Sequence, residues 1–163
     1  MSNGAIRFSE EVEYYTPKYI VDKFGPFDYD PATTKEQAEH LGIPDYDTKE
    51  TNGLFSDWTK YDRIWINPPF TEKYEFLKKA IDTLHEADVK YDKYVEIYIL
   101  LPVSYLTTRS FSFLMELEDY DLYLPYGRIK FENSKRELRS PAFGSVIINP
   151  HFGGCKRIIP LEI

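Results

Sequence analysis

The chain has 163 residues, a length typical of one domain, and we expect a single domain over residues 1–163. Its formal net charge of −7 argues against a uniformly basic surface, so contact with nucleic-acid phosphates would need a local basic segment. The single cysteine, Cys155, excludes an internal disulfide, and the three histidines have no metal-ligand spacing, so we expect no metal. No apolar run is long enough to cross a membrane and the first residues lack a signal-peptide pattern, so we expect a cytoplasmic protein without a membrane partner.

Apolar periodicity and the start and stop signals of helices predict strands that alternate with helices along the chain. The expected elements are, in order, a loose lead-in (1–12), a helix capped by Thr16 with Pro17 at its first position (to 24), a strand (27–30), a helix from Thr33 or Thr34 to Leu41 stopped by Gly42, an irregular polar stretch (43–60), a strand (63–66), a helix (72–88), a strand (95–101) ended by Pro102, a helix (111–117), and strands at 121–124, 129–131, 145–149 and 158–161. This order predicts an α/β fold with a mostly parallel sheet, whose ligands bind at the carboxyl ends of the strands. Asp30 and Asn67 each occupy such an end.

The segment Asn67-Pro68-Pro69-Phe70 follows a buried strand and has the chemistry needed to act on an exocyclic amine. Such a nitrogen is a poor nucleophile, because its lone pair is delocalised into the ring of the base. The Asn67 side-chain oxygen and a proline carbonyl can accept its two hydrogens, and consecutive prolines make the turn rigid. The ring of Phe70 can stack on a base that has been turned out of a helix.

This segment resembles the catalytic motif of amino methyltransferases, and the surrounding chain is similar to the phage-type (Dam-like) DNA N6-adenine methyltransferase family. The resemblance covers about residues 14–150 and rests on these stretches, in order: Tyr15-Thr16-Pro17, Phe27-Asp28-Tyr29-Asp30-Pro31-Ala32, Asn52-Gly53-Leu54 followed by Trp58, Trp65-Ile66-Asn67-Pro68-Pro69-Phe70, Leu100-Leu101-Pro102, Gly127-Arg128-Ile129-Lys130-Phe131 and Ser140-Pro141-Ala142-Phe143-Gly144-Ser145. It implies the class I, Rossmann-like methyltransferase sheet, S-adenosyl-L-methionine as cofactor, DNA as partner, and a bacterial host cell as the setting.

The same resemblance assigns the cofactor to the first part of the chain. Tyr15, Thr16 and Pro17 would contact its methionine part, and Asp30, with Pro31 and Ala32 after it, would accept from the ammonium group. No Gly-x-Gly follows the strand that contains Asp30, and only 37 residues separate Asp30 from Asn67. We therefore expect a sheet trimmed between its first and fourth strands. Asp57 and Asn52 are the candidates for the ribose hydroxyls.

A basic segment near the end of the chain is the candidate DNA-binding surface. Residues 128–139 contain five basic side chains against two acidic ones, in a chain that is acidic overall. Such a segment concentrates positive potential at one place. The basic residues are Arg128, Lys130, Lys135, Arg136 and Arg139, and Phe131 lies among them.

Three other functions remain open at this point. N4 of cytosine is an amine that presents the same chemical problem, and an Asn-Pro-Pro-aromatic motif also serves methyltransferases that modify a glutamine amide in a protein. The acidic composition would suit a protein substrate, whereas the missing Gly-rich motif and the match at 127–131 argue against it. A non-catalytic DNA- or cofactor-binding module would have no need of two amine acceptors. The oligomeric state and the recognition sequence are not encoded in any pattern found here.

Overall fold

The computed structural model describes residues 14–163, so the lead-in expected at 1–12 lies outside the described residues. Its helices are α2 (Lys18–Val21), α3 (Lys35–Leu41), α4 (Lys73–Tyr91) and α5 (Arg109–Met115), with 3-10 helices η1 (Gly53–Phe55), η2 (Trp58–Lys60), η3 (Phe70–Glu72) and η4 (Val103–Thr107). Its strands are β1 (Tyr29–Asp30), β2 (Asp45–Tyr46), β3 (Arg63–Ile66), β4 (Glu96–Pro102), β5 (Asp119–Pro125), β6 (Phe131–Glu132), β7 (Leu138–Arg139), β8 (Ser145–His151) and β9 (Lys156–Leu161).

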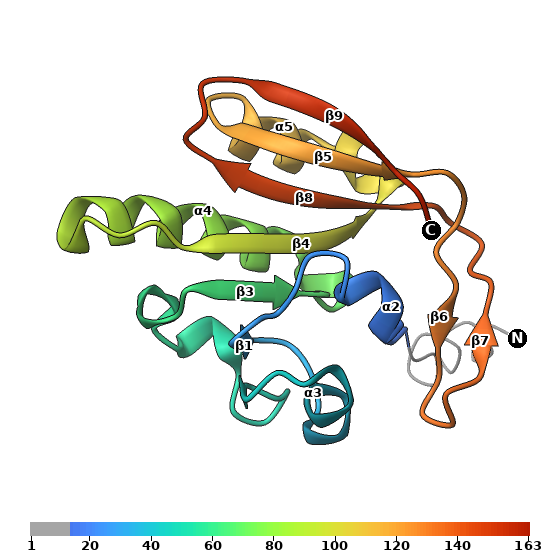
Figure 1. Ribbon diagram of the computed structural model, residues 1–163. Helices are drawn as coiled ribbons and strands as arrows, with labels where there is room; N and C mark the ends of the chain where they lie inside the picture. The colour runs from blue at the N-terminus through green and yellow to red at the C-terminus, as the bar shows by residue number, and fades with distance from the viewer. Residues whose placement is uncertain (1–13) are drawn as a thin grey trace, which may run out of the picture.

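Seven strands form one sheet in the order β2-β1-β3-β4-β8-β5-β9, and β6 pairs with β7 in a separate hairpin (Figure 1). All neighbouring pairs in the large sheet are parallel except the two that involve β8. The sheet therefore confirms the expected α/β class with mostly parallel pairing.

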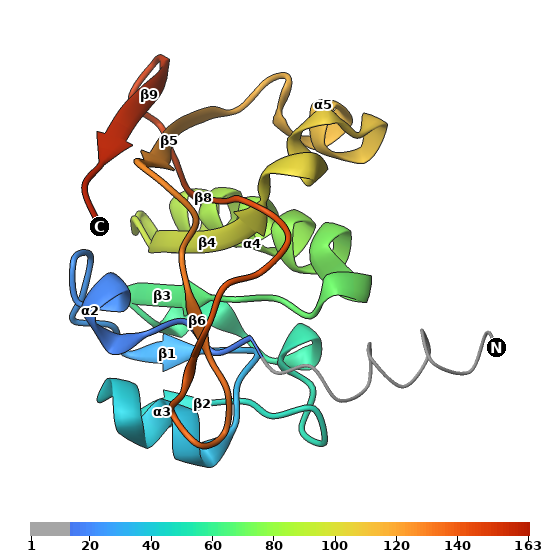
Figure 2. The ribbon, with the colours of Figure 1, turned by 90° about the vertical axis from the view of Figure 1, so that its right-hand side faces the viewer.

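The carboxyl ends of β1, β3 and β4 meet at one side of this sheet, here called the carboxyl edge. Pro102, the last residue of β4, pairs with Ser145, the first residue of the antiparallel β8, so the chain that enters β8 lies at the same edge. Figure 2 looks onto this edge and shows the β6–β7 segment crossing in front of β1 and β3. The topology thus brings the Asn67 segment and residues 126–144 to one side of the molecule.

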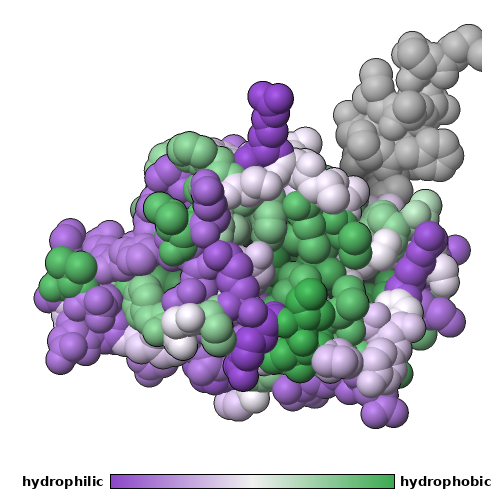
Figure 3. Space-filling view, turned by 90° about the horizontal axis from the view of Figure 1, so that it is seen from above, coloured by the Kyte–Doolittle hydropathy of each residue, from purple (hydrophilic) through white to green (hydrophobic). Residues whose placement is uncertain are grey.

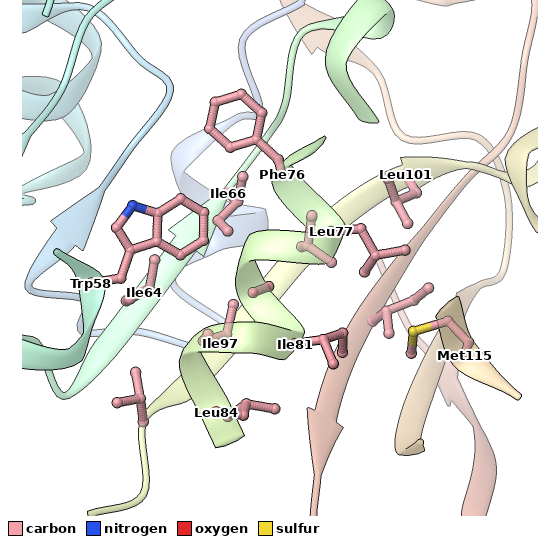
Figure 4. Close-up of a cluster of buried hydrophobic side chains, with 14 of the residues drawn as sticks. Trp58, Ile64, Ile66, Phe76, Leu77, Ile81, Leu84, Ile97, Leu101 and Met115 are labelled. Atoms are coloured by element: carbon pink, nitrogen blue, oxygen red, sulfur yellow. The ribbon is translucent and has the colours of Figure 1, made fainter. Parts of the chain in front are cut away.

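Helices cover both faces of the sheet, with α4 and α5 on one and α2 and α3 on the other (Figure 2). The α4 face holds a core of fully buried side chains, among them Ile64, Leu77, Leu84 and Ile97 (Figure 4). Each such aliphatic side chain contributes roughly 1.5–3 kcal/mol when it is removed from water. The period of these residues along α4 is the helical pattern that the sequence predicts at 72–88.

Local signals located most elements correctly. Thr34 caps α3 by accepting from the Gln37 amide, and Gly42 ends this helix in the left-handed conformation, with φ 75°. Three expectations are wrong. Residues 43–60 contain the short strand β2, and Pro17, without a side-chain cap, stands where Thr16 was expected to begin the first helix. Pro102 also pairs within β4 instead of ending it earlier.

The far edge of the sheet carries exposed apolar side chains. Seen from above, hydrophobic surface gathers over β5, β9 and α5 (Figure 3). Phe113 of α5 is 77% exposed, and Ile158 of the edge strand β9 is 69% exposed. Within residues 14–163, no helix has the length and apolar character needed to cross a membrane.

Candidate active site at the carboxyl edge

Asn67 follows β3 directly, and its amide is held from one side. Its Nδ2 donates to the carbonyl oxygen of Tyr14 at 2.7 Å and to Oγ1 of Thr16 at 3.2 Å. Because a carbonyl oxygen only accepts, the nitrogen must face Tyr14 and Oδ1 must point the other way. No hydrogen bond within the described residues ends on this Oδ1. The side chain is half-buried, so Oδ1 is an oriented acceptor at an accessible position.

The two prolines after Asn67 have different surroundings. Pro68 is buried and Pro69 is exposed. The carbonyl of Pro69 accepts from the Glu72 amide at 3.0 Å in the turn that begins η3. No described hydrogen bond ends on the Pro68 carbonyl, so Pro68 is the better second acceptor of the expected pair.

Phe70 belongs to a cluster of four aromatic rings. Phe70 lies 5.1 Å from the ring of Tyr14 and 5.4 Å from that of Phe143, and it remains 45% exposed. Tyr14 also meets Phe131 edge-on at 5.6 Å. Phe70 thus packs against neighbouring rings while part of its own surface stays exposed, as a residue that stacks on a base would need. Phe131, expected at the DNA surface, is only 1% exposed, because its ring packs into the core on the α2 and α3 face.

Thr16 is buried beside Asn67 and has a different local role from the helix cap that the sequence predicts. Its hydroxyl accepts from Asn67, and its carbonyl accepts from Nε2 of Gln37 at 3.2 Å. Tyr15 forms a two-bond antiparallel bridge with Glu132. The segment Tyr15-Thr16-Pro17 therefore lies between Asn67, α3 and the β6–β7 hairpin.

Asp30 ends β1 at the same edge and is a buried carboxyl. It is 2% exposed, and its Oδ1 accepts from the Ala32 amide at 2.9 Å. Burial raises its pKa to about 7, although the hydrogen bond from Ala32 opposes this. Among residues 14–163 no basic side chain forms an ion pair with it. Such a group is suited to accept a cation from a bound molecule.

The loop after Asp30 is packed tightly against the segment around Gly53. A Cβ added to Gly53 would stand 2.1 Å from the Pro31 carbonyl oxygen, so only glycine fits there. Asn52, with φ 55°, uses its side-chain oxygen to cap the Leu54 amide. Gly53 thus allows the close backbone contact with the loop after β1 that glycines within that loop would otherwise allow.

Asp57 caps the start of η2. Its Oδ1 accepts from the amide and the hydroxyl of Thr59, which lowers its pKa. It lines a cavity of about 240 Å³ with Phe55 and Lys79, between η2 and α4. The Thr59 carbonyl accepts from Lys93, in the turn that enters β4 from the opposite edge of the sheet.

Asp47 is a residue that the sequence reasoning missed. It follows β2, and its amide donates to the Asp30 carbonyl at 3.0 Å. Its burial disfavours ionisation, but hydrogen bonds from Ser56 and Tyr29 outweigh this and lower its pKa. The signal was the repetition of Asp28-Tyr29-Asp30 as Asp45-Tyr46-Asp47. The two stretches pair in parallel with an offset of one residue, Tyr29 with Asp45 and Asp30 with Tyr46.

The basic segment divides into paired and unpaired side chains. Arg136 bonds to Glu132 and Gln37, and Arg139 bonds to Glu137. Arg128 donates to the Pro141 carbonyl. Lys130 and Lys135 are exposed, and neither has an ion pair in the part of the chain that the structure describes. The excess positive charge of the segment therefore resides on Arg128, Lys130 and Lys135.

Comparison with known proteins decides the family. A model of the DNA N-6-adenine-methyltransferase (Dam) family matches residues 12–150, which include both Asp30 and the Asn67 segment. The chain belongs to the Dam family. A DNA N-6-adenine-methyltransferase of Escherichia phage T1 is 32% identical over 66 residues, which cover 40% of this chain. The matched part spans only 26% of that phage protein.

Proposed function

We propose that this Dam-family chain transfers the methyl group of S-adenosyl-L-methionine to N6 of adenine in DNA. Asn67 carries the proposal, because its Oδ1 points away from Tyr14 and Thr16, and neither this oxygen nor the Pro68 carbonyl accepts a hydrogen bond within the described residues. These two oxygens would accept the hydrogens of the amine and localise its lone pair on nitrogen. When bound, the cofactor would supply an electrophilic methyl group on its sulfonium: the methyl would pass to N6, the sulfur would keep the electron pair of the broken bond as a thioether, and the N6 proton would go to solvent.

The buried carboxyl of Asp30 supports binding of the cofactor at the end of β1. Its unpaired position fits the ammonium of the methionine part, with Pro31 and Ala32 forming the adjacent wall. Tyr15, Thr16 and Pro17 would close the other side, through backbone groups and the Tyr15 ring. For the ribose hydroxyls we favour Asp47 over Asp57, because an acid at the end of the second strand is the common arrangement in such sheets and Asp57 caps η2.

We also infer that the sheet is a trimmed class I methyltransferase sheet. The parallel set β2-β1-β3-β4, the reversed β8 and the helices on both faces support this. The stretch between β1 and β3 contains one short strand, β2, as expected for a sheet trimmed on that side.

DNA would approach the carboxyl edge across the β6–β7 hairpin. Phe70 would stack on the extruded adenine, and Arg128, Lys130, Lys135 and Arg139 would contact phosphates. Arg136, which we also expected there, has internal partners. The surface chemistry is consistent with binding that depends on local charge in a protein of net charge −7.

The test is transfer of tritiated methyl groups from S-adenosyl-L-methionine to DNA, followed by digestion and separation of the nucleosides. Label in N6-methyl-2′-deoxyadenosine would support the proposal. Label in N4-methyl-2′-deoxycytidine would mean that the same chemistry acts on cytosine instead of adenine. Label in added protein but not in DNA would favour the glutamine alternative, and no label in either would reject a methyltransferase. The Asn67→Ala variant serves as the negative control.

A further inference from the structure

We propose that Gln37 and Arg136 are positioning residues, which hold the segment Tyr14–Thr16 in place and through it orient the amide of Asn67. The proposal rests on the proposed function for the part that concerns catalysis. Neither residue contacts the expected site of reaction. Both act through the short chain segment that provides the two acceptors for Asn67 Nδ2.

Gln37 connects this segment to the hairpin through both ends of its amide. It is 4% exposed; its Nε2 donates to the Thr16 carbonyl, and its Oε1 accepts from Nη1 of Arg136. The two partners differ in kind, because the Thr16 carbonyl can only accept a hydrogen bond and the Arg136 guanidinium can only donate one. A glutamine side chain satisfies both, whereas glutamate lacks the donor and methionine lacks both groups.

The tip of the hairpin is shaped so that Arg136 turns back toward the sheet. Arg136 has a φ of 62°, a left-handed conformation that a residue with a side chain adopts only when its surroundings require it. Asn133 accepts from the amides of Lys135 and Glu137 and so forms the turn. The guanidinium then meets Glu132 at 3.2 Å and lies 5.7 Å from the Tyr15 ring.

The backbone of Tyr15 also connects this segment to the hairpin. Its amide donates to the Glu132 carbonyl at 3.0 Å, and its carbonyl accepts from the Glu132 amide at 2.8 Å. The hairpin, α3 and the segment before α2 are therefore tied together around Thr16. Loss of Gln37 or Arg136 would leave Thr16 and Tyr14 less constrained, and the Asn67 amide would no longer be held in one orientation.

Steady-state kinetics with DNA as substrate test the catalytic part. Gln37→Met and Arg136→Met should each lower kcat by roughly 10- to 100-fold, the usual effect of misplacing a catalytic group, with little change in KM. The double variant should lose no more kcat than the more impaired of the two single variants, because both changes break one connection. Gln37→Glu keeps the size and the acceptor for Arg136, so it should fold normally and still lose kcat. Lys35→Met, on the exposed side of α3, is the matched control and should keep full kcat.

Hydrogen exchange at the Tyr15 amide gives a second measurement that does not need activity. Exchange should be faster in Gln37→Met and Arg136→Met than in the wild type, and unchanged in Lys35→Met. Unchanged exchange in both variants would overturn the proposal. Faster exchange with unaltered kcat would also overturn it, and so would losses of kcat that add in the double variant. If the wild type proved inactive on DNA, the proposed function would fail, and exchange alone would then decide whether the two residues hold this segment.

Discussion

The amide nitrogen of Asn67 lies 2.7 Å from the carbonyl oxygen of Tyr14, and this contact determines which atom of the side chain faces the open side of the site. Thr16 provides a second acceptor for the same nitrogen at 3.2 Å. The contact joins two segments that are 53 residues apart in the chain. It gives the expected catalytic residue a defined orientation before any substrate binds, which is the condition for electrostatic stabilisation of a transition state.

Asn67→Ala should lower kcat by on the order of 100-fold or more, the typical effect of deleting one preorganised polar group. Asn67→Asp should also lose activity, because a carboxylate cannot donate to the Tyr14 carbonyl and would be repelled by it. Cofactor affinity measured by calorimetry should change little in Asn67→Ala. Near-normal turnover in both variants would remove Asn67 from the mechanism.

The stability of the protein should depend on the ionisation of Asp30. Its pKa is raised by burial to about 7 in the folded protein, against about 3.9 in an unfolded chain. The favourable contribution of the protonated group is therefore complete below about pH 4 and is lost as the pH rises to about 7. Asp30→Asn should be more stable than the wild type at pH 8 and lose this advantage at pH 4, as measured by urea unfolding.

Cofactor binding provides the matching test of the same carboxyl. An ammonium group binds the ionised form, so affinity for S-adenosyl-L-methionine should rise as the pH passes through about 7. Calorimetry at pH 6 and pH 8 should show this rise in the wild type and a weak, flat affinity in Asp30→Asn. Equal affinities for the two proteins at both pH values would place the cofactor elsewhere.

Neutralising Lys130 and Lys135 together should weaken binding to all DNA sequences alike. These lysines have no carboxylate partner among the described residues, so each is available to a phosphate. The slope of log K against log salt should decrease in magnitude by about two, close to 0.9 for each lost contact. Neutralising Lys78 and Lys90, which are paired within α4, is the matched control and should leave the slope unchanged. Identical slopes in all three proteins would show that Lys130 and Lys135 do not contact DNA phosphates.

Gly53→Ala should destabilise the protein by roughly 1–3 kcal/mol, the usual cost of forcing an extra carbon into a packed site. The new Cβ would collide with the Pro31 carbonyl and displace the loop that follows Asp30. Gly127→Ala is the control, since its Cβ would meet nothing within 4 Å. Thermal unfolding of the two variants would reveal the difference, and equal melting temperatures would show that the loop yields easily.

Several elements could be predicted because their signals are local. The cap at Thr34, the stop at Gly42 and the apolar period along α4 act within a few residues of the chain, and each appears in the structure. The order of strands and helices followed from the same signals. Strand β2 could not be found in this way, because two polar residues become a strand only when β1 lies beside them.

The sequence by itself determined the α/β class, the family resemblance and the position of the Asn67 segment after a buried strand. Only the tertiary structure decided the partners of these residues. It bonded Thr16 to Asn67, buried Phe131, engaged Asp57 with Thr59 and turned Arg136 inward. The physical reason is that a side chain's nearest charges and hydrogen-bond partners come from segments far along the chain, and their approach depends on how the whole sheet and its hairpin pack.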